Sequence, residues 1–204
     1  MTAAAARLVL ATANRSKLAE LARILAEEHA DVALATLPDF PGAPDVAETG
    51  ATFAENALLK AQAIAEFTGL PAVADDSGLC VDALNGMPGV LSARWSGRHG
   101  DDAANLRLVL GQVADVPDER RAARFTCAAA LVVPGGTEHV AEGVVTGRLI
   151  REPRGSNGFG YDPIFVPDGY DITTAEMDPG DKDKISHRGR ALRALAPEIR
   201  RSVR

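Results

Sequence analysis

The run Leu70-Pro71-Ala72-Val73-Ala74-Asp75-Asp76-Ser77-Gly78 places two adjacent acids after an apolar stretch. The apolar part predicts a buried strand, and Ser77-Gly78 favours a turn after it. Carboxylates at the end of a buried strand are typical of an active site, although Asp-Asp-Ser-Gly is also ordinary turn chemistry. Because neighbouring side chains of a strand point to opposite faces, Asp75 and Asp76 can share a site only if the turn redirects the second. We predict that one is chemical and the other architectural.

The segments around this run alternate between strand and helix patterns, judged by apolar spacing, capping residues and turn signals. We expect a strand at 7–11, a helix ending at Glu28, a strand at 32–36, a helix from the capping box at 52–55 to about Phe67, a helix at 101–110, strands at 124–133 and 139–150, and a closing helix at 191–199. The last two strands predict a long antiparallel hairpin. The pattern predicts an α/β fold with a mixed central sheet flanked by helices.

Composition limits the class of protein. With 204 residues, 46% of them hydrophobic and 25% charged, the chain is expected to form a single domain over 1–204. The net charge of −6 argues against a nucleic-acid partner, which needs a basic face. The chain start lacks the features of a secretory signal and no apolar run has membrane-spanning length, so we expect a cytoplasmic protein without a membrane partner. Cys80 and Cys127 lack metal-site spacing and are predicted to be buried free thiols.

The use of lysine singles out a few positions. Of the 22 basic residues other than histidine, only four are lysines: Lys17, Lys60, Lys182 and Lys184. A compact ammonium suits phosphate as a point charge, whereas arginine brings a planar fork. Lys17, Lys60 and Lys182 are therefore candidates for binding an anionic substrate. Lys184 is expected on a solvated surface, and such a position is equally open for Lys60.

The segment Thr12-Ala13-Asn14-Arg15-Ser16-Lys17 occupies the first strand-to-helix turn. A helix start there offers free backbone N–H groups and a positive dipole end, with Lys17 in the first turn. This arrangement predicts a phosphate cradle, although it lacks the glycines and the Gly-Lys-Ser/Thr order of a P-loop. The alternative is an ordinary helix start capped by Asn14.

Two later segments carry candidate ligand-binding groups. Gly158-Phe159-Gly160-Tyr161-Asp162-Pro163 joins flexible glycines to aromatic rings that could stack on a base, although such rings are often hydrophobic plugs under a loop. Ser186-His187-Arg188-Gly189 should start the last helix, with Ser186 as N-cap. Together with Lys182, its donors suit a phosphate or the edge of a nucleotide. A Ser77–His187–Asp162 triad is disfavoured because Ser77 lacks a Gly-x-Ser-x-Gly elbow.

These segments, taken in order, resemble the inosine/xanthosine triphosphate pyrophosphatase family. Each motif is weak, but the ordered set is specific and extends over nearly the whole chain. The resemblance rests on Thr12-Ala13-Asn14-x-x-Lys17, Glu48-Thr49-Gly50-x-Thr52-Phe53-x-Glu55-Asn56-Ala57, Ala74-Asp75-Asp76-Ser77-Gly78, Pro88-Gly89, Phe159-Gly160-Tyr161-Asp162-Pro163 and Ser186-His187-Arg188-Gly189.

The resemblance implies an enzyme that hydrolyses non-standard purine nucleoside triphosphates such as ITP, dITP and XTP to the monophosphate and pyrophosphate. It also implies a Mg²⁺-dependent homodimer with an active cleft between two lobes. By motif, Asp76 is the general base and a metal ligand, and Ser77 contacts the substrate. Residues 12–17 would hold the phosphates, and Phe159 to Asp162 the nucleoside. The purine edge or a neighbouring phosphate would fall to Lys182, His187 and Arg188.

Two departures from the family pattern affect the site. Ala13 replaces a common glycine, and Ala47 stands where many members have an acid, which leaves Glu48 as the expected second metal carboxylate. Magnesium needs only one or two carboxylates besides water and phosphate oxygens, so Asp76 and Glu48 are sufficient. The alternatives are a Maf-like pyrophosphatase acting on modified pyrimidine or methylated nucleotides, and a nucleotide sensor without turnover.

Overall fold

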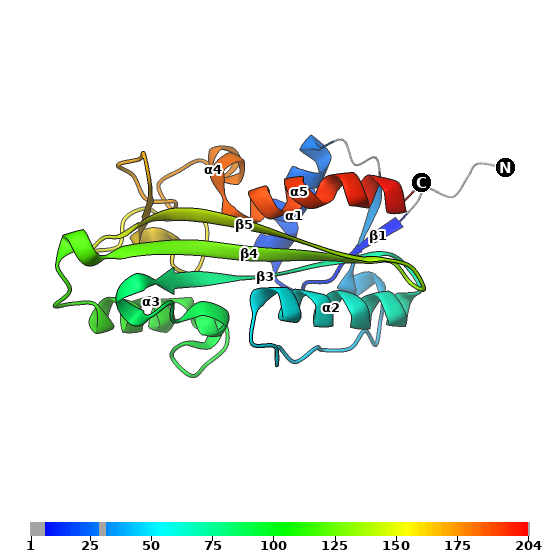
Figure 1. Ribbon diagram of the computed structural model, residues 1–204, viewed down its shortest axis with the longest axis horizontal. Helices are drawn as coiled ribbons and strands as arrows, with labels where there is room; N and C mark the ends of the chain where they lie inside the picture. Colours follow the sequence, from blue (N-terminus) through cyan, green and yellow to red (C-terminus); the bar gives the residue numbers. More distant parts are fainter. Residues whose placement is uncertain (1–6, 29–31, 204) are drawn as a thin grey trace. The chain divides into compact units, whose positions relative to one another are not determined.

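The computed structural model describes residues 7–28 and 32–203, which form two compact units. Unit 1 comprises the described parts of 1–76, 127–143 and 188–204, and unit 2 comprises 77–126 and 144–187. The helices and strands, labelled as in Figure 1, are β1 (Arg7–Leu10), α1 (Arg15–Glu27), β2 (Ala33–Thr36), α2 (Phe53–Thr68), β3 (Ala72–Val81), α3 (Asp102–Gln112), β4 (Ala122–Val132), β5 (Glu138–Leu149), β6 (Phe165–Pro167), α4 (Pro179–Ile185) and α5 (His187–Ser202).

The strands form one six-stranded mixed sheet in the order β2-β1-β3-β4-β5-β6. β1 runs parallel to both β2 and β3, whereas β6 is antiparallel to β5. β4 and β5 are the long hairpin expected from the sequence, and the Val133 N–H donates to the Thr137 carbonyl at its turn. The predicted mixed α/β fold with flanking helices is confirmed. The single domain and the cleft between lobes stay predictions.

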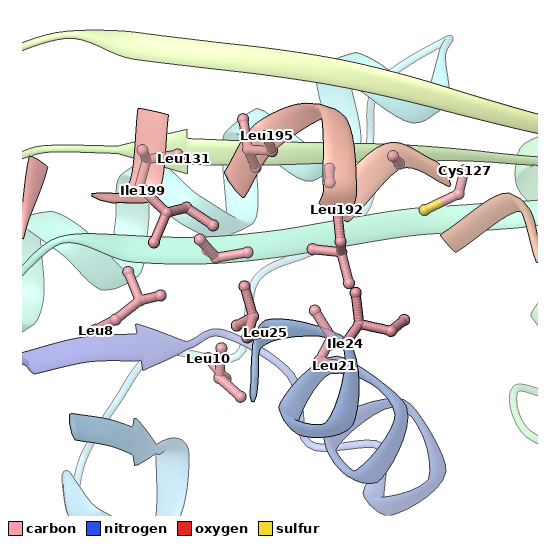
Figure 2. Close-up of a cluster of buried hydrophobic side chains, with 13 residues drawn as sticks. Leu8, Leu10, Leu21, Ile24, Leu25, Cys127, Leu131, Leu192, Leu195 and Ile199 are labelled. Atoms are coloured by element: carbon pink, nitrogen blue, oxygen red, sulfur yellow. The ribbon is translucent and has the colours of Figure 1, made fainter. Parts of the chain in front are cut away.

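In unit 1, helices cover both faces of the sheet. Leucine and isoleucine side chains of α1 and α5 pack on one face, and Figure 2 shows Leu21, Ile24, Leu192 and Leu195 among them. Small side chains of α2 pack on the other face, against strand residues that alternate with the first set. In β1 this alternation puts Leu8 and Leu10 in the first cluster and Val9 in the second. Each face of this part of the sheet is therefore buried under its own helices.

The predicted turn at Ser77-Gly78 is wrong, because β3 continues through it to Val81. Gly78 is needed for close approach: a Cβ on it would lie 2.4 Å from both the Gly89 carbonyl oxygen and the Ser92 Oγ. The same Ser92 hydroxyl accepts from the Leu79 N–H at 2.9 Å and donates to the Gly89 carbonyl at 2.6 Å. The sequence thus places glycine where the 3₁₀ helix Gly89–Arg94 packs against the strand.

Unit 2 has its own core, in which α3 packs with strand residues and aromatic rings. The Phe125 and Phe165 rings meet edge to face with centroids 4.8 Å apart, and Leu106 and Val109 of α3 belong to the same cluster. A buried Arg121 donates to the carbonyl oxygens of residues 113, 149 and 150 and so ties the chain after α3 to the end of β5.

Two elements, α4 and β6, had no counterpart among the sequence expectations. Asp178 at the N-cap position and Pro179 at the first helical position of α4 are an ordinary start signal. α5 also runs past Pro197 to Ser202, further than predicted. Both cysteines are buried and free, as expected. Among the described residues, no helix is both long and apolar enough to cross a membrane.

Candidate active site

Asp75 and Asp76 lie in the middle of an uninterrupted strand, so their side chains leave opposite faces of the sheet. Asp75 contacts Lys17 of α1 and Arg188 of α5. Asp76 contacts Asn56 and Lys60 of α2. Both carboxylates are buried, with 2% and 5% of each residue exposed. The two acids therefore have different surroundings, as the expectation of two different roles requires. The cause is the continuous strand and not a turn.

Asp76 is held by a buried amide. Asn56 is 0% exposed, and its Nδ2 donates to the Asp76 Oδ2 at 3.0 Å. The orientation of the amide is fixed because its Oδ1 accepts from the Gly50 N–H at 2.7 Å. One oxygen of Asp76 is thus occupied and oriented, while the other, Oδ1, lies 3.6 Å from the Lys60 ammonium.

Lys60 joins the two predicted metal carboxylates. Its Nζ lies 2.7 Å from Glu48 Oε1 and 3.6 Å from Asp76 Oδ1. The Lys60 ammonium thus lies between the two acids and pairs with both of them. Among residues 7–28 and 32–203, no group of three or more His, Cys, Asp or Glu side chains could hold a metal ion. Two carboxylates with water and phosphate oxygens are a donor set that fits Mg²⁺.

The protonation of Asp76 is shifted in the direction that a general base requires. Burial raises the pKa of Asp76 above its ordinary value, the Lys60 ammonium opposes this, and the neighbouring Glu48 adds to it. The pKa of Lys60 is raised in turn, because Asp76, Asp75 and Glu48 outweigh the effect of burial on its ammonium. A carboxylate with a raised pKa accepts a proton from water more readily.

On the opposite face, Asp75 is the centre of an ion cluster. Its Oδ2 lies 3.1 Å from the Lys17 Nζ and accepts from the Arg188 Nε at 3.0 Å. Burial would raise the pKa of Asp75, but the charges of Lys17, Arg188 and Lys60 outweigh it and hold the pKa far below its usual range. Asp75 therefore stays ionised and does not act as an acid or base. Its architectural role is not in a turn, because β3 continues through Ser77-Gly78.

Arg188 is committed to the interior of unit 1. It is 1% exposed, and its Nη1 donates to the Glu20 Oε2 at 2.5 Å in addition to the bond from its Nε to Asp75. Burial alone would lower the pKa of Arg188, but these two carboxylates raise it. These contacts are with buried acids, and the predicted role of Arg188 at the purine edge or a neighbouring phosphate stays a prediction.

The first turn of α1 is capped by Asn14, as one interpretation of segment 12–17 expected, and the phosphate cradle stays a prediction. Asn14 is the N-cap, and its Oδ1 accepts from the N–H groups of Ser16 and Lys17. Thr12 Oγ1 in turn accepts from the Asn14 N–H at 3.2 Å. The residues from Ala13 to Ser16, Arg15 included, are exposed, so the helix start is open to a ligand.

In unit 2, Asp162 and Lys182 form a buried ion pair of 2.6 Å. Asp162 also accepts from the Phe159 N–H at 2.8 Å and from the Thr174 hydroxyl at 2.8 Å. The Lys182 ammonium lies 5.4 Å from the centroid of the half-exposed Phe159 ring. Only glycine fits at position 158, where φ is +75° and a Cβ would lie 2.1 Å from the Asp162 carboxylate. Asp162 thus fixes the loop that presents Phe159 and pairs with Lys182 of α4.

The remaining predicted residues of unit 2 differ in how far they are buried. Tyr161 is 4% exposed, and its hydroxyl donates to the Ser92 carbonyl, which fits the alternative of a hydrophobic plug under the loop; its place at the nucleoside stays a prediction. The His187 ring is stacked on Phe125, with centroids 4.9 Å apart and an angle of 12° between the planes. Ser77 is partly exposed on β3, and Gly160 donates its N–H to Asp102.

Sequence reasoning assigned no role to Asn56 or Glu20, which hold Asp76 and Arg188. Asn56 stood inside a quoted motif, and a polar residue within the alanine-rich face of a helix was a signal that could have drawn attention to it. Glu20 offered no comparable signal, because its partner is 168 positions away along the chain.

Comparison with known sequences places this geometry in a family. The sequence model of the Ham1 family matches residues 8–198. A dITP/XTP pyrophosphatase of Streptomyces coelicolor is 60% identical over 194 residues, covering 95% of this chain and 97% of the relative. A protein of the same name from Nocardia farcinica is 62% identical over 195 residues, covering 95% of each chain.

Solved structures agree in fold. A nucleoside-triphosphatase / dITP/XTP pyrophosphatase from Mycobacterium abscessus is 59% identical, with a TM-score of 0.75 and coverage of 94% of this chain and 99% of the other. A HAM1 protein from Coxiella burnetii is 44% identical, with a TM-score of 0.84 and coverage of 95% and 98%. With a family match over nearly its whole length and relatives of this similarity, the chain belongs to the Ham1 family.

Proposed function

We propose that the protein hydrolyses non-standard purine nucleoside triphosphates, dITP, ITP and XTP, to the monophosphate and pyrophosphate, and so cleanses the nucleotide pool. The names of relatives at about 60% identity support this activity. The observation that carries the mechanism is Asp76, a buried carboxylate with a raised pKa that Asn56 holds by one oxygen. Such a group can deprotonate a water molecule.

In the proposed reaction, Asp76 removes a proton from water, which attacks the α-phosphorus, and pyrophosphate leaves. Asn56 keeps Asp76 Oδ2 engaged, so the oxygen that faces Lys60 is the one that accepts the proton. Lys17 and the start of α1 hold the phosphates as an ammonium and a set of backbone N–H donors. Asp76 and Glu48 would hold Mg²⁺, which supplies charge neutralisation of the phosphates when bound.

Selection of the base falls to unit 2 in this proposal. The Lys182 ammonium and the His187 ring carry donors that suit the O6 atom of a 6-oxo purine, and Phe159 offers a partly exposed ring. Adenine has an amino group where these substrates have O6, so its binding would leave buried donors unpaired. A mismatch of this kind can discriminate by a factor of about 10⁴.

We also propose that the enzyme works as a homodimer in the cytoplasm without a nucleic-acid or membrane partner. The net charge of −6 supports a small nucleotide as substrate in preference to a polynucleotide. Light scattering of the purified protein is expected to give the mass of two chains; the mass of a single chain would contradict the dimer.

The test of the function is pyrophosphate release from ITP, XTP, GTP and ATP, with Mg²⁺ and with a chelator. We expect turnover of ITP and XTP, little of GTP and ATP, and loss of all turnover with the chelator. A panel that includes dUTP and 5-methyl-UTP separates the Maf-like alternative. Fast turnover of ATP would contradict the proposed specificity, and ITP binding without pyrophosphate release would establish a sensor instead.

A further inference from the structure

Four charged side chains form one cluster inside unit 1. Lys17 and Glu20 come from α1, Asp75 from β3 and Arg188 from the first turn of α5. Two charges are positive and two negative, so the cluster is neutral as a whole. The side chains of Asp75, Arg188 and Glu20 are between 0% and 4% exposed, whereas that of Lys17 is 15% exposed. Lys17 is thus the member of the cluster that a ligand can reach.

The bonds within the cluster run in a chain. Glu20 accepts from Arg188 Nη1, Arg188 Nε donates to Asp75 Oδ2, and the Lys17 ammonium lies 3.1 Å from the same Oδ2. Lys17 and Glu20 are three residues apart on α1 and therefore lie on one face of the helix. The planar fork of Arg188 can bind two carboxylates at once, which a lysine cannot do with fixed geometry.

This arrangement decides where the Lys17 ammonium is held. Without Glu20, the buried guanidinium of Arg188 would lose one carboxylate partner and compete more strongly with Lys17 for Asp75. Buried ion networks contribute little net stability compared with an apolar core, so their value lies in the geometry that they specify. Here the specified geometry is the position of the Lys17 ammonium, the candidate group for binding phosphate.

We propose that Glu20 and Arg188 are positioning residues that hold Asp75 so that it orients the Lys17 ammonium toward the phosphates. The inference rests on the proposed function, in which Lys17 binds the triphosphate. It predicts that a change at Glu20 acts on phosphate binding only through Lys17. A residue that merely supported the fold would have no such dependence.

The experiment measures the affinity of inorganic tripolyphosphate by calorimetry for the wild type, Glu20→Gln, Lys17→Ala and the double variant. Loss of one charged hydrogen bond in the chain is expected to weaken binding to Glu20→Gln by about tenfold. The double variant should bind as weakly as Lys17→Ala alone, because the two changes share one route. Glu27→Gln is the matched control, since this acid lies on the same helix with its side chain 51% exposed.

Three results would overturn the inference. They are an unchanged affinity of Glu20→Gln for tripolyphosphate, additive losses of affinity in the double variant, and no tripolyphosphate binding by the wild type. If Glu20→Gln fails to fold, Arg188→Lys replaces it, because lysine keeps the charge but loses the planar fork. The same weakening of tripolyphosphate binding is expected for Arg188→Lys, and wild-type affinity would overturn the proposal.

Failure of the proposed function is seen separately. A wild type that binds tripolyphosphate but releases no pyrophosphate from ITP refutes the activity and leaves the role of the cluster standing.

Discussion

Asp76→Asn is expected to lower kcat for ITP by about a thousandfold, within the range that a general base contributes. Asparagine keeps the size of the side chain but cannot take a proton from water. KM is expected to change far less, because Lys17 and the start of α1 bind the phosphates in the proposed site. Steady-state pyrophosphate release measures both constants. A variant with more than a tenth of the wild-type kcat would remove Asp76 from the chemistry.

The control for this change is Asp82→Asn. Asp82 directly follows β3, its side chain is 58% exposed, and it pairs at 3.0 Å with Arg124 on the surface. Surface ion pairs of this kind contribute about 1 kcal/mol at most, so activity and stability should stay near wild type. Equal losses from both substitutions would show that the effect at Asp76 is not specific.

Thermal unfolding separates loss of chemistry from loss of fold. The pKa of Asp76 is raised in the folded protein, so the folded state binds more protons than the unfolded state above about pH 3.9. Stability therefore falls as pH rises through the window between that value and the raised pKa, and Asp76→Asn lacks this loss. The melting temperature of the variant, relative to wild type, should be higher at pH 7 than at pH 4.

Gly78→Ala is expected to lower the free energy of unfolding by about 2–3 kcal/mol, as overpacking of a tight interior does. The added Cβ would lie 2.4 Å from the Gly89 carbonyl oxygen, a backbone atom that cannot rotate away. It would also meet the Ser92 hydroxyl, which bonds the Leu79 N–H and the Gly89 carbonyl. For a chain of this length the melting temperature should fall by roughly 5–10 °C.

Gly111→Ala is the matched control, because a Cβ at this helical glycine has nothing within 4 Å. Alanine in a helix is favoured over glycine by about 0.5–1 kcal/mol, so the control should be at least as stable as wild type. If Gly78→Ala melts at the wild-type temperature, the close packing of Gly89–Arg94 against β3 is not as the structure shows.

Local patterns in the sequence predicted most of the elements but not the course of β3. Ser77-Gly78 has the composition of a turn, and nothing nearby in the chain reveals that Gly89 and Ser92 pack against Gly78. The separation of Asp75 from Asp76 was predicted from strand alternation, which holds because the strand does not stop. The opposite directions of the two side chains were thus anticipated, while their partners required tertiary contacts.

The same limit applies to the site. Asp76, Lys17 and Lys60 could be selected from residue type and motif, because acids and lysines are rare inside apolar segments. The roles proposed for Glu20 and Arg188 depend on contacts between α1 and α5, segments separated by most of the chain. For Tyr161 the sequence left a stacking ring and a buried plug both open, because an aromatic ring next to glycine has the same sequence pattern whether it is buried or exposed.

In the proposed reaction, water activated by Asp76 attacks the α-phosphorus. Hydrolysis of ITP in heavy-oxygen water, followed by mass spectrometry of both products, tests it most directly. The account predicts one heavy oxygen in the phosphate of IMP and none in pyrophosphate. Label in pyrophosphate, or release of labelled inorganic phosphate with IDP, would show attack at another phosphorus and contradict it.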